Sequence, residues 1–237
     1  MKEILKPYQK EFAYSYTSGA YATIELLRAC PELTEAVYLH SDCAQPEPIE
    51  ALCARHSIPV LRSDAAFKRI NQKENSYVLG VFRKFPSAID AEAPHVVLVN
   101  PGDMGNLGTI VRTLVGCGLA NLAVISPAAD VWHPKTIRAS MGALFHIRFQ
   151  QFESFDAYRA AFPSHEIFPF MPGGGIELRP GAAPRVPRFS LVFGNEACGL
   201  DEGFRRIGTC VTIPQSPQVD SLNLSIAVAL GAYLFTL

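Results

Sequence analysis

The sequence predicts an α/β protein in which helices accompany a mainly parallel sheet. Short apolar runs recur along the chain, and segments with helical spacing of apolar residues separate them. Strands separated by helices of about ten residues form βαβ units, and such units build parallel sheets. The composition supports a folded core, because 49% of the 237 residues are hydrophobic and only 18% are charged. This length suits one large domain or two smaller ones.

The amino-terminal part, residues 1–92, carries the first α/β series. Apolar spacing predicts helices over residues 23–30, 48–56 and 63–70. Ser63 is a candidate N-cap for the third helix. Strands are predicted over residues 36–40, 59–62 and 77–82. Residues 86–94 are small, polar and bracketed by prolines, which predicts a linker to a second domain of residues 93–237.

The second α/β series fills the carboxyl-terminal domain. Strands are predicted over residues 95–99, 122–126, 144–149, 166–170, 189–193 and 209–213. Helices are predicted over about residues 106–117, 153–161 and 200–206, and from about residue 221 to the end. Residues 172–187 are rich in Gly and Pro. We interpret this stretch as a mobile surface connection that could lie against a substrate.

The charge balance limits the classes of function to consider, and the cysteines indicate a cellular compartment. The 21 Lys and Arg residues nearly balance the 22 Asp and Glu residues. This balance argues against a histone-like nucleic-acid binder but leaves a local basic face open. The six cysteines are scattered, with no metal or disulfide spacing. We therefore expect reduced thiols in a cytoplasmic protein without a metal site.

Neither end of the sequence predicts membrane association. The first residues contain no apolar segment of the kind found in signal peptides. The apolar run over residues 224–237 is shorter than the roughly 20 residues that cross a bilayer. We expect this run to form a buried helix, with a subunit interface as one place for it.

A first polar loop opens the helix predicted at 106–117. Asn106-Leu107-Gly108 resembles the glycine-containing loops that present backbone N–H groups and a positive helix dipole to an anion. Arg112 follows among apolar neighbours, so its guanidinium is expected to need a partner. That partner is either a local carboxylate or an anionic ligand.

A second polar loop, Gly194-Asn195-Glu196, ends the strand predicted at 189–193. Gly194 has no Cβ, which lets the chain approach a ligand closely. Glu196 either pairs with a cationic group or caps the helix that begins near Leu200.

A third polar loop runs from Ile213-Pro214 to Ser221-Leu222-Asn223 and leads into the final apolar helix. Ser221 is a candidate N-cap of that helix. Because the polar residues of the helix cluster at its start, we expect them to face whatever the loop binds. Ligands of open α/β folds bind at the carboxyl ends of strands, so the three loops are predicted to form one site.

Other common kinds of active site are not evident in the sequence. No Ser-His-Asp arrangement is recognisable, and the six histidines lack the spacing of metal ligands. A G-x-G-x-x-G dinucleotide motif is absent.

Taken in order, the three stretches resemble the SpoU branch of the SPOUT RNA methyltransferases, also called the TrmH family. Residues 106–112 are similar to its first motif, N-x-G-x-x-x-R, and residues 194–200 to its second, G-N-E-x-x-G-L. Its third motif, I-P followed by S-L-N, is matched by residues 213–214 and 221–223. A further family segment is similar to residues 134–142. The resemblance covers about residues 93–237, and its order and spacing are more specific than any single motif.

This resemblance implies a carboxyl-terminal deep trefoil knot and, more loosely, an amino-terminal substrate-binding domain like the ribosomal L30e proteins. It implies transfer of a methyl group from S-adenosyl-L-methionine to a ribose 2′-hydroxyl of structured RNA, either ribosomal or transfer RNA. It also implies a homodimer formed through the carboxyl-terminal domain. The residues implied to line the catalytic pocket are Asn106, Arg112, Glu196, Ser221 and Asn223. The residues implied to contact the cofactor, largely through the backbone, are Gly194, Ile213 and Leu222.

The chain departs from the family pattern before the first motif and within the third. Asn100-Pro101-Gly102-Asp103 stands where an acidic residue followed by proline is commoner. Pro214-Gln215-Ser216-Pro217 stands where the family usually has methionine and glycine.

The proton acceptor of the implied reaction stays open. Arginine as the base is opposed by its pKa above about 12. Arg112 as a phosphate clamp leaves the proton to a phosphate oxygen or to Glu196. Two alternatives to the main hypothesis are a catalytically silent RNA-binding protein of this fold and an enzyme of this fold that methylates a base.

Overall fold

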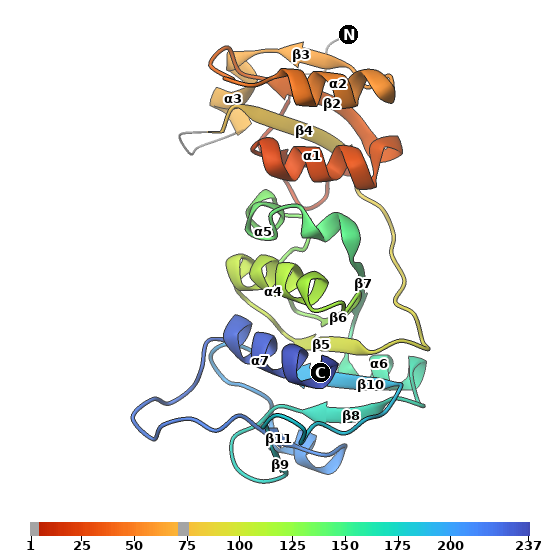
Figure 1. Cartoon of the computed structure of the whole chain (residues 1–237), viewed down its shortest axis with the longest axis vertical. Coiled ribbons are helices and arrows are strands. Elements are labelled where there is room, and N and C mark those ends of the chain that lie inside the picture. Colours follow the sequence, from red (N-terminus) through yellow and green to blue (C-terminus); the bar gives the residue numbers. More distant parts are fainter. Residues whose placement is uncertain (1–4, 71–75) are drawn as a thin grey trace. The chain divides into compact units, whose positions relative to one another are not determined.

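The structure is a computed structural model that describes residues 5–70 and 76–237. The chain divides into two compact units, whose elements are labelled in Figure 1. Unit 1 consists of Met1–Phe85 and Asp130–His146, and unit 2 of Pro86–Ala129 and Ile147–Leu237. Residues 130–146, which lie inside the predicted carboxyl-terminal domain, therefore pack with the amino-terminal residues.

The sheet of unit 1 has the strand order β1-β4-β2-β3. Its strands are β1 (Tyr14–Ser18), β2 (Thr34–Leu39), β3 (Val60–Arg62) and β4 (Val78–Arg83). β4 runs antiparallel to both β1 and β2, whereas β2 and β3 are parallel. The mainly parallel sheet predicted for this half is therefore wrong, because β4 enters between β1 and β2 in the opposite direction.

β1 is a strand that the sequence did not predict. Three of its five residues are Ser or Thr, and Ser15 and Thr17 are completely buried although they are polar. The Ser15 hydroxyl donates to the carbonyl of Trp132, and the Thr17 and Thr23 hydroxyls are hydrogen-bonded at 2.7 Å. Burying a hydroxyl is tolerated when it finds such a partner, so this strand lacks the usual hydrophobic pattern.

Three helices of unit 1 confirm the predicted positions to within a few residues: α1 (Ala20–Ala29), α2 (Glu47–Arg55) and α3 (Asp64–Ile70). The sequence did not predict α5 (Pro134–Ala139) or the 3₁₀ helices η1 (Pro31–Leu33) and η2 (Ala143–His146). Ser63 caps α3 as predicted, because its hydroxyl accepts the Ala66 N–H at 3.3 Å. α1 and α2 pack on β2 around Leu27, Val37 and Ile49.

The sheet of unit 2 is parallel, as predicted, with the strand order β7-β6-β5-β10-β8. Its strands are β5 (His95–Val99), β6 (Asn121–Ile125), β7 (Arg148–Phe152), β8 (Glu166–Pro169) and β10 (Phe189–Phe193). A short parallel pair joins β9 (Ile176–Glu177) to β11 (Val211–Thr212). The strand predicted at 144–149 begins four residues later, because residues 143–146 form η2.

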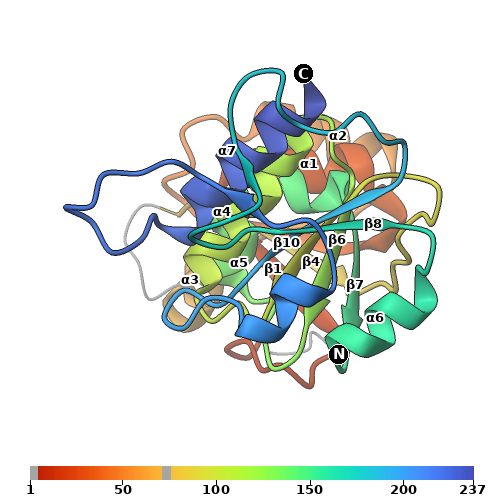
Figure 2. The same ribbon diagram turned by 90° about the horizontal axis from the view of Figure 1, so that it is seen from below.

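Helices cover both faces of this sheet (Figure 2). They are α4 (Met104–Gly116), α6 (Phe155–Ala161), α7 (Leu224–Thr236) and the 3₁₀ helix η3 (Glu202–Arg206). α4 and α7 pack against each other, and α6 packs against β6 and β7. Strand side chains alternate between the faces, so Val97 and Val192 meet α6 and its neighbours while Phe168 and Phe189 meet Phe235 of α7.

The predicted linker is packed on unit 2 rather than free. Ile89 is buried in the same core as α6, and the Asp90 N–H donates to the side chain of Asn121 at 2.9 Å. Within residues 5–70 and 76–237, no helix has the length and apolar character needed to cross a membrane.

Candidate active site

Two of the predicted motif loops meet at the carboxyl ends of neighbouring strands. β5 and β10 are adjacent and parallel, with Phe193 paired to Leu98. The loop after β5 leads into α4, and the loop after β10 carries Gly194-Asn195-Glu196. The Asn195 side-chain N–H donates to the carbonyl of Asn100 at 2.8 Å, which ties the two loops together. This edge is where ligands of parallel α/β sheets bind.

The Glu196 carboxylate is held by the beginning of α4. It accepts the backbone N–H groups of Gly102 at 2.9 Å and Asp103 at 3.1 Å, and the Asn106 side-chain N–H at 3.3 Å. Burial by itself would raise the pKa of Glu196, but these hydrogen bonds outweigh it and hold the pKa below its usual value. Glu196 therefore caps α4 from another loop, rather than the helix near Leu200 that was one of its two predicted roles.

Asn106 connects the first motif to the third. The Asn223 side-chain N–H donates to Asn106 Oδ1 at 3.1 Å, while Asn106 donates to Glu196. Asn223 is also the N-cap of α7, because its Oδ1 accepts the Ser225 N–H at 2.9 Å. One hydrogen-bonded chain, Glu196–Asn106–Asn223, thus joins residues from all three motifs.

Ser221 lies just outside this chain. The sequence predicts Ser221 as a candidate N-cap, but α7 begins at Leu224 and its cap is Asn223, two residues after Ser221. Ser221 is exposed on the loop that leads into α7, and in the described part of the chain its side chain has no hydrogen-bond partner.

Arg112 is also separate from the hydrogen-bonded chain. The expectation that its guanidinium would need a partner assumed a mostly apolar helix surface, and the structure corrects it. α4 buries Leu107, Ile110, Val111 and Leu114, whereas Arg112 is on the exposed side. Among residues 5–70 and 76–237 it makes no ion pair or hydrogen bond, so its guanidinium is exposed to solvent on the same helix as Asn106.

Gly194 is required by its own loop. A Cβ at this position would lie 2.1 Å from the carbonyl carbon of Gly199, so the close approach is to the chain itself. Gly199 closes the turn by donating its N–H to the Asn195 carbonyl at 2.9 Å, and it has a φ of 68°. The contact with Gly199 therefore explains why residue 194 is a glycine, without the predicted close approach to a ligand.

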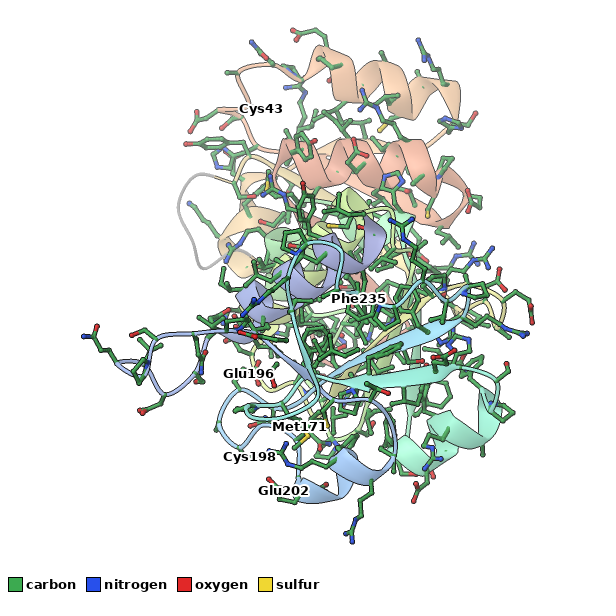
Figure 3. All side chains as sticks on the ribbon, turned by 60° about the horizontal axis from the view of Figure 1, so that its bottom comes forward. Cys43, Met171, Glu196, Cys198, Glu202 and Phe235 are labelled. Carbon is green, nitrogen blue, oxygen red and sulfur yellow. The ribbon has the colours of Figure 1, made fainter. Side chains whose placement is uncertain are left out.

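The two remaining predicted cofactor residues flank the third loop. Ile213 and Leu222 are both half-buried, and the chain between them is exposed. Figures 1 and 2 show this loop, in blue, reaching away from the body of unit 2. Glu196 and Met171 are on loops at the same edge of the sheet (Figure 3).

Sequence reasoning missed the turn before α4 as part of the site. Asn100 has a φ of 55°, a backbone conformation that Asn tolerates better than most residues. This turn supplies the Gly102 and Asp103 N–H groups to Glu196, and Asp103 also caps α4 by accepting the Asn106 N–H at 2.8 Å. The signal was present as a polar Asn-Pro-Gly-Asp turn directly after a strand.

The fold and this edge define a class of protein: an α/β domain whose polar loops meet at the carboxyl ends of parallel strands, where folds of this kind bind ligands. In the described residues, no group of three His, Cys, Asp or Glu side chains is arranged to hold a metal ion. The chain belongs to the SpoU rRNA Methylase family, whose model matches residues 93–233.

Named relatives and solved structures are similar to nearly the whole chain. The 23S rRNA (guanosine(2553)-2′-O)-methyltransferase RlmP of Bacillus subtilis is 28% identical over 221 residues, which are 91% of this chain and 85% of the relative. The 23S rRNA (adenosine(1067)-2′-O)-methyltransferase of Streptomyces laurentii is 28% identical over 217 residues, 87% of this chain and 80% of the relative. The AdoMet-bound rRNA methyltransferase of Sinorhizobium meliloti has a TM-score of 0.80 at 24% identity, covering 94% of this chain and 87% of that one.

Proposed function

We propose that this protein transfers a methyl group from S-adenosyl-L-methionine to a ribose 2′-hydroxyl of structured RNA, ribosomal or transfer RNA. The observation that carries the proposal is the hydrogen-bonded chain from Glu196 through Asn106 to Asn223, which unites three motifs at one sheet edge. Family membership and the names of the relatives support the same reaction.

The residues of this chain act mainly by positioning. Bound S-adenosylmethionine supplies an electrophilic methyl group, and we propose that the backbone of Gly194, Ile213 and Leu222 holds it. A ribose oxygen must lie about 3 Å from that methyl and in line with the breaking bond, so orientation contributes much of the rate. We assign this orientation to Asn106, Ser221 and Asn223, whose amide and hydroxyl groups both donate and accept hydrogen bonds.

Glu196 is a poor proton acceptor in this arrangement. Its lowered pKa means that the carboxylate is a weaker base than an ordinary glutamate, because its oxygens already accept backbone and amide donors. We propose that Glu196 fixes the first and second motifs, that Arg112 binds an RNA phosphate, and that the proton leaves to a phosphate oxygen or to solvent.

A deep trefoil knot is part of this proposal. β10 lies between β5 and β8 although β8 precedes it in the chain, and the segment after β10 returns to pair β11 with β9 before α7 packs on α4. A path that crosses itself in this way supports a threaded carboxyl-terminal half. Such threading is rare, and it would keep the three loops together.

Residues 1–92 are proposed to bind the RNA substrate through an L30e-like fold. Support comes from unit 1, where Tyr21 at the start of α1 is 60% exposed and offers a ring for base stacking. Lys135 and Arg138 belong to the same unit and supply cationic groups for phosphate contacts.

A homodimer through the carboxyl-terminal domain completes the proposal. α7 exposes Ile226 by 51%, Leu230 by 39% and Tyr233 by 57%, and Leu237, which directly follows the helix, is 64% exposed. Their spacing of four, three and four residues puts them on one side of the helix, and an apolar stripe of this kind usually marks an interface. A cytoplasmic location is consistent with six free cysteines, one of them the exposed Cys198.

Transfer of a labelled methyl group from S-adenosylmethionine to total unmodified RNA tests the proposal. We expect incorporation into RNA, with the label in 2′-O-methylated nucleosides after digestion. RNA binding without incorporation would identify a catalytically silent binding protein, and label in a methylated base would identify a base methyltransferase. Mapping ribose methylation in cells with and without the gene would identify the nucleotide.

A further inference from the structure

The loop after β8 has a conformation that only glycine readily adopts. We call residues 171–175, Met-Pro-Gly-Gly-Gly, the glycine loop. Gly173, Gly174 and Gly175 have φ values of 72°, 91° and 76°, where a Cβ would strain the backbone. A Cβ on Gly175 would also lie 1.9 Å from the carbonyl oxygen of Cys210. The conformation of this turn therefore requires glycine at these three positions.

Two side chains bind the carbonyl groups of the glycine loop. The Arg205 guanidinium on η3 donates to the carbonyl of Pro172 at 2.8 Å and also to that of Gly173. Its third nitrogen, Nε, pairs with Glu202 at 2.7 Å, which fixes the direction of the guanidinium. The Thr212 hydroxyl shares its proton between the carbonyls of Met171 at 3.0 Å and Gly174 at 2.7 Å.

The same loop leaves its N–H groups available. Four successive carbonyls accept side-chain donors, whereas the N–H groups of residues 173–175 have no acceptor within the described parts of the chain. These glycines are exposed. Backbone N–H groups without an internal acceptor bind water or a ligand. The loop thus presents a row of donors.

The position of the glycine loop places these donors beside the expected cofactor contacts. The Phe170 N–H donates to the carbonyl of Val192, so the loop leaves the sheet close to Gly194. On its other side the loop is bound by Thr212, which directly precedes Ile213. The glycine loop therefore lies between the chain segments that carry Gly194 and Ile213, two of the three residues proposed to hold S-adenosylmethionine. The adenine, ribose and carboxylate of this cofactor all carry acceptor atoms.

We propose that Arg205 is a positioning residue for S-adenosylmethionine. It does not touch the cofactor in this scheme. By binding two carbonyls of the glycine loop it fixes the N–H groups of residues 173–175 toward the ligand, and so reduces the ordering that binding would otherwise require. This inference rests on the proposed function, and it adds a residue that lies outside the three sequence motifs.

The test compares Arg205→Gln and Arg205→Lys with Arg206→Gln. Arg206 is the neighbouring exposed arginine, with no ion pair or hydrogen bond in the described residues, so its variant controls for loss of one positive charge. Calorimetric titration of the RNA-free protein with S-adenosylmethionine is expected to give an about tenfold weaker Kd for Arg205→Gln. Arg205→Lys should resemble it, because lysine lacks the planar fork that reaches two carbonyls. Arg206→Gln should match the wild type.

Two further readouts separate positioning from a general loss of structure. Hydrogen exchange without cofactor is expected to accelerate at the glycine-loop amides of Arg205→Gln while the amides of β5 and β6 stay protected. In steady-state assays the KM for S-adenosylmethionine should rise while the KM for RNA and kcat stay near the wild type.

An unchanged Kd for the cofactor, equal effects of the Arg205 and Arg206 variants, or a parallel rise of both KM values would overturn the positioning role. If the wild type and Arg205→Gln bind the cofactor equally well, the positioning role of Arg205 is overturned and the proposed function stays intact. Wild-type protein without cofactor binding would overturn the proposed function itself, whereas the exchange measurement still reports whether Arg205 orders the loop.

Discussion

Asn106 shows how a single amide organises this site. It donates to Glu196 and accepts from Asn223, so its two ends face different partners. An amide is suited to this position because it carries both a donor and an acceptor, whereas a carboxylate or an ammonium carries only one kind. Glu196 lies on the loop after β10 and Asn223 caps α7, so the position of Asn106 on α4 depends on two other segments of the chain.

Arg112 is the residue whose role is easiest to separate from stability. It is exposed, and no group in the described residues pairs with it, so Arg112→Ala should leave the Tm within about a degree or two of the wild type. If it binds an RNA phosphate, the variant should bind RNA about three- to tenfold more weakly and the salt dependence should fall by about one phosphate contact. Filter binding across a salt series measures both.

Two variants control this prediction. Arg159→Ala removes an exposed arginine from α6 and should leave RNA binding unchanged. Arg112→Lys keeps the positive charge and should keep most of the RNA affinity together with measurable turnover. Retained RNA affinity with abolished turnover in Arg112→Lys would contradict a simple phosphate clamp.

We expect His95 to make the stability of unit 2 depend on pH. It is fully buried, its Nδ1 is 2.8 Å from the Tyr158 hydroxyl, its Nε2 is 2.8 Å from the Asp90 carbonyl, and its ring lies 4.2 Å from that of His165. Burial lowers the pKa of His95 to about 4. The folded protein therefore holds the neutral ring, and its stabilising effect is complete above the unfolded pKa of about 6.5.

The expected outcome is a loss of stability as the pH falls from about 6.5 to about 4, where protonation favours the unfolded chain by a few kcal/mol. Urea unfolding at a series of pH values measures it. His95→Gln should be less stable at neutral pH but should show a shallower pH dependence. His56→Gln, which changes an exposed histidine, should keep the wild-type slope. Equal slopes in all three proteins would show that His95 does not titrate in this range.

At the scale of elements, α7 carries two different faces. Val228, Ala232 and the N-cap Asn223 face the body of unit 2, whereas the stripe of Ile226, Leu230 and Tyr233 is exposed.

We expect Ile226→Asp with Tyr233→Asp to convert a dimer into a monomer, because charge within an apolar interface loses its solvation. Sedimentation velocity measures the mass. Tyr21→Asp, which changes an exposed aromatic residue of unit 1, should leave the dimer intact, and a wild-type monomer would refute the interface.

The elements differ in how much of them the sequence could predict. Buried parallel strands such as β5 and β10 are continuous apolar runs, which the sequence identifies readily. β1 was not predicted, because its buried serine and threonine bind partners that are distant in sequence, such as Trp132. Pairings of this kind leave no local pattern in the sequence. The motif loops were located from residue type and order, but the exposure of Arg112 and the capping of α4 by Glu196 depend on which side of a helix faces the sheet.

At the scale of the whole molecule, neither unit is one continuous stretch of sequence, because residues 130–146 belong to unit 1 and interrupt unit 2. This segment leaves unit 2 after Ala129, packs within unit 1 and returns at Ile147. Its Phe145 ring meets Phe82 with centroids 5.2 Å apart, and its Gly142 fits against Glu25 of α1, where a Cβ would lie 2.6 Å from the Glu25 Cβ. A boundary drawn from the linker alone could not include these contacts, because their partners are more than 60 residues away.

A fragment of residues 86–237 should therefore fold incompletely. It retains every strand of the parallel sheet but removes the partners of Phe145 and Trp132, which pack on Phe82 and Phe85 in unit 1. We expect proteases to cut the fragment within residues 130–146 while the rest resists, because a segment without buried contacts opens locally. The full-length protein should resist cleavage there, and adding back residues 1–85 in trans should restore part of the protection. A fragment as resistant as the full-length protein at residues 130–146 would show that the segment folds without unit 1.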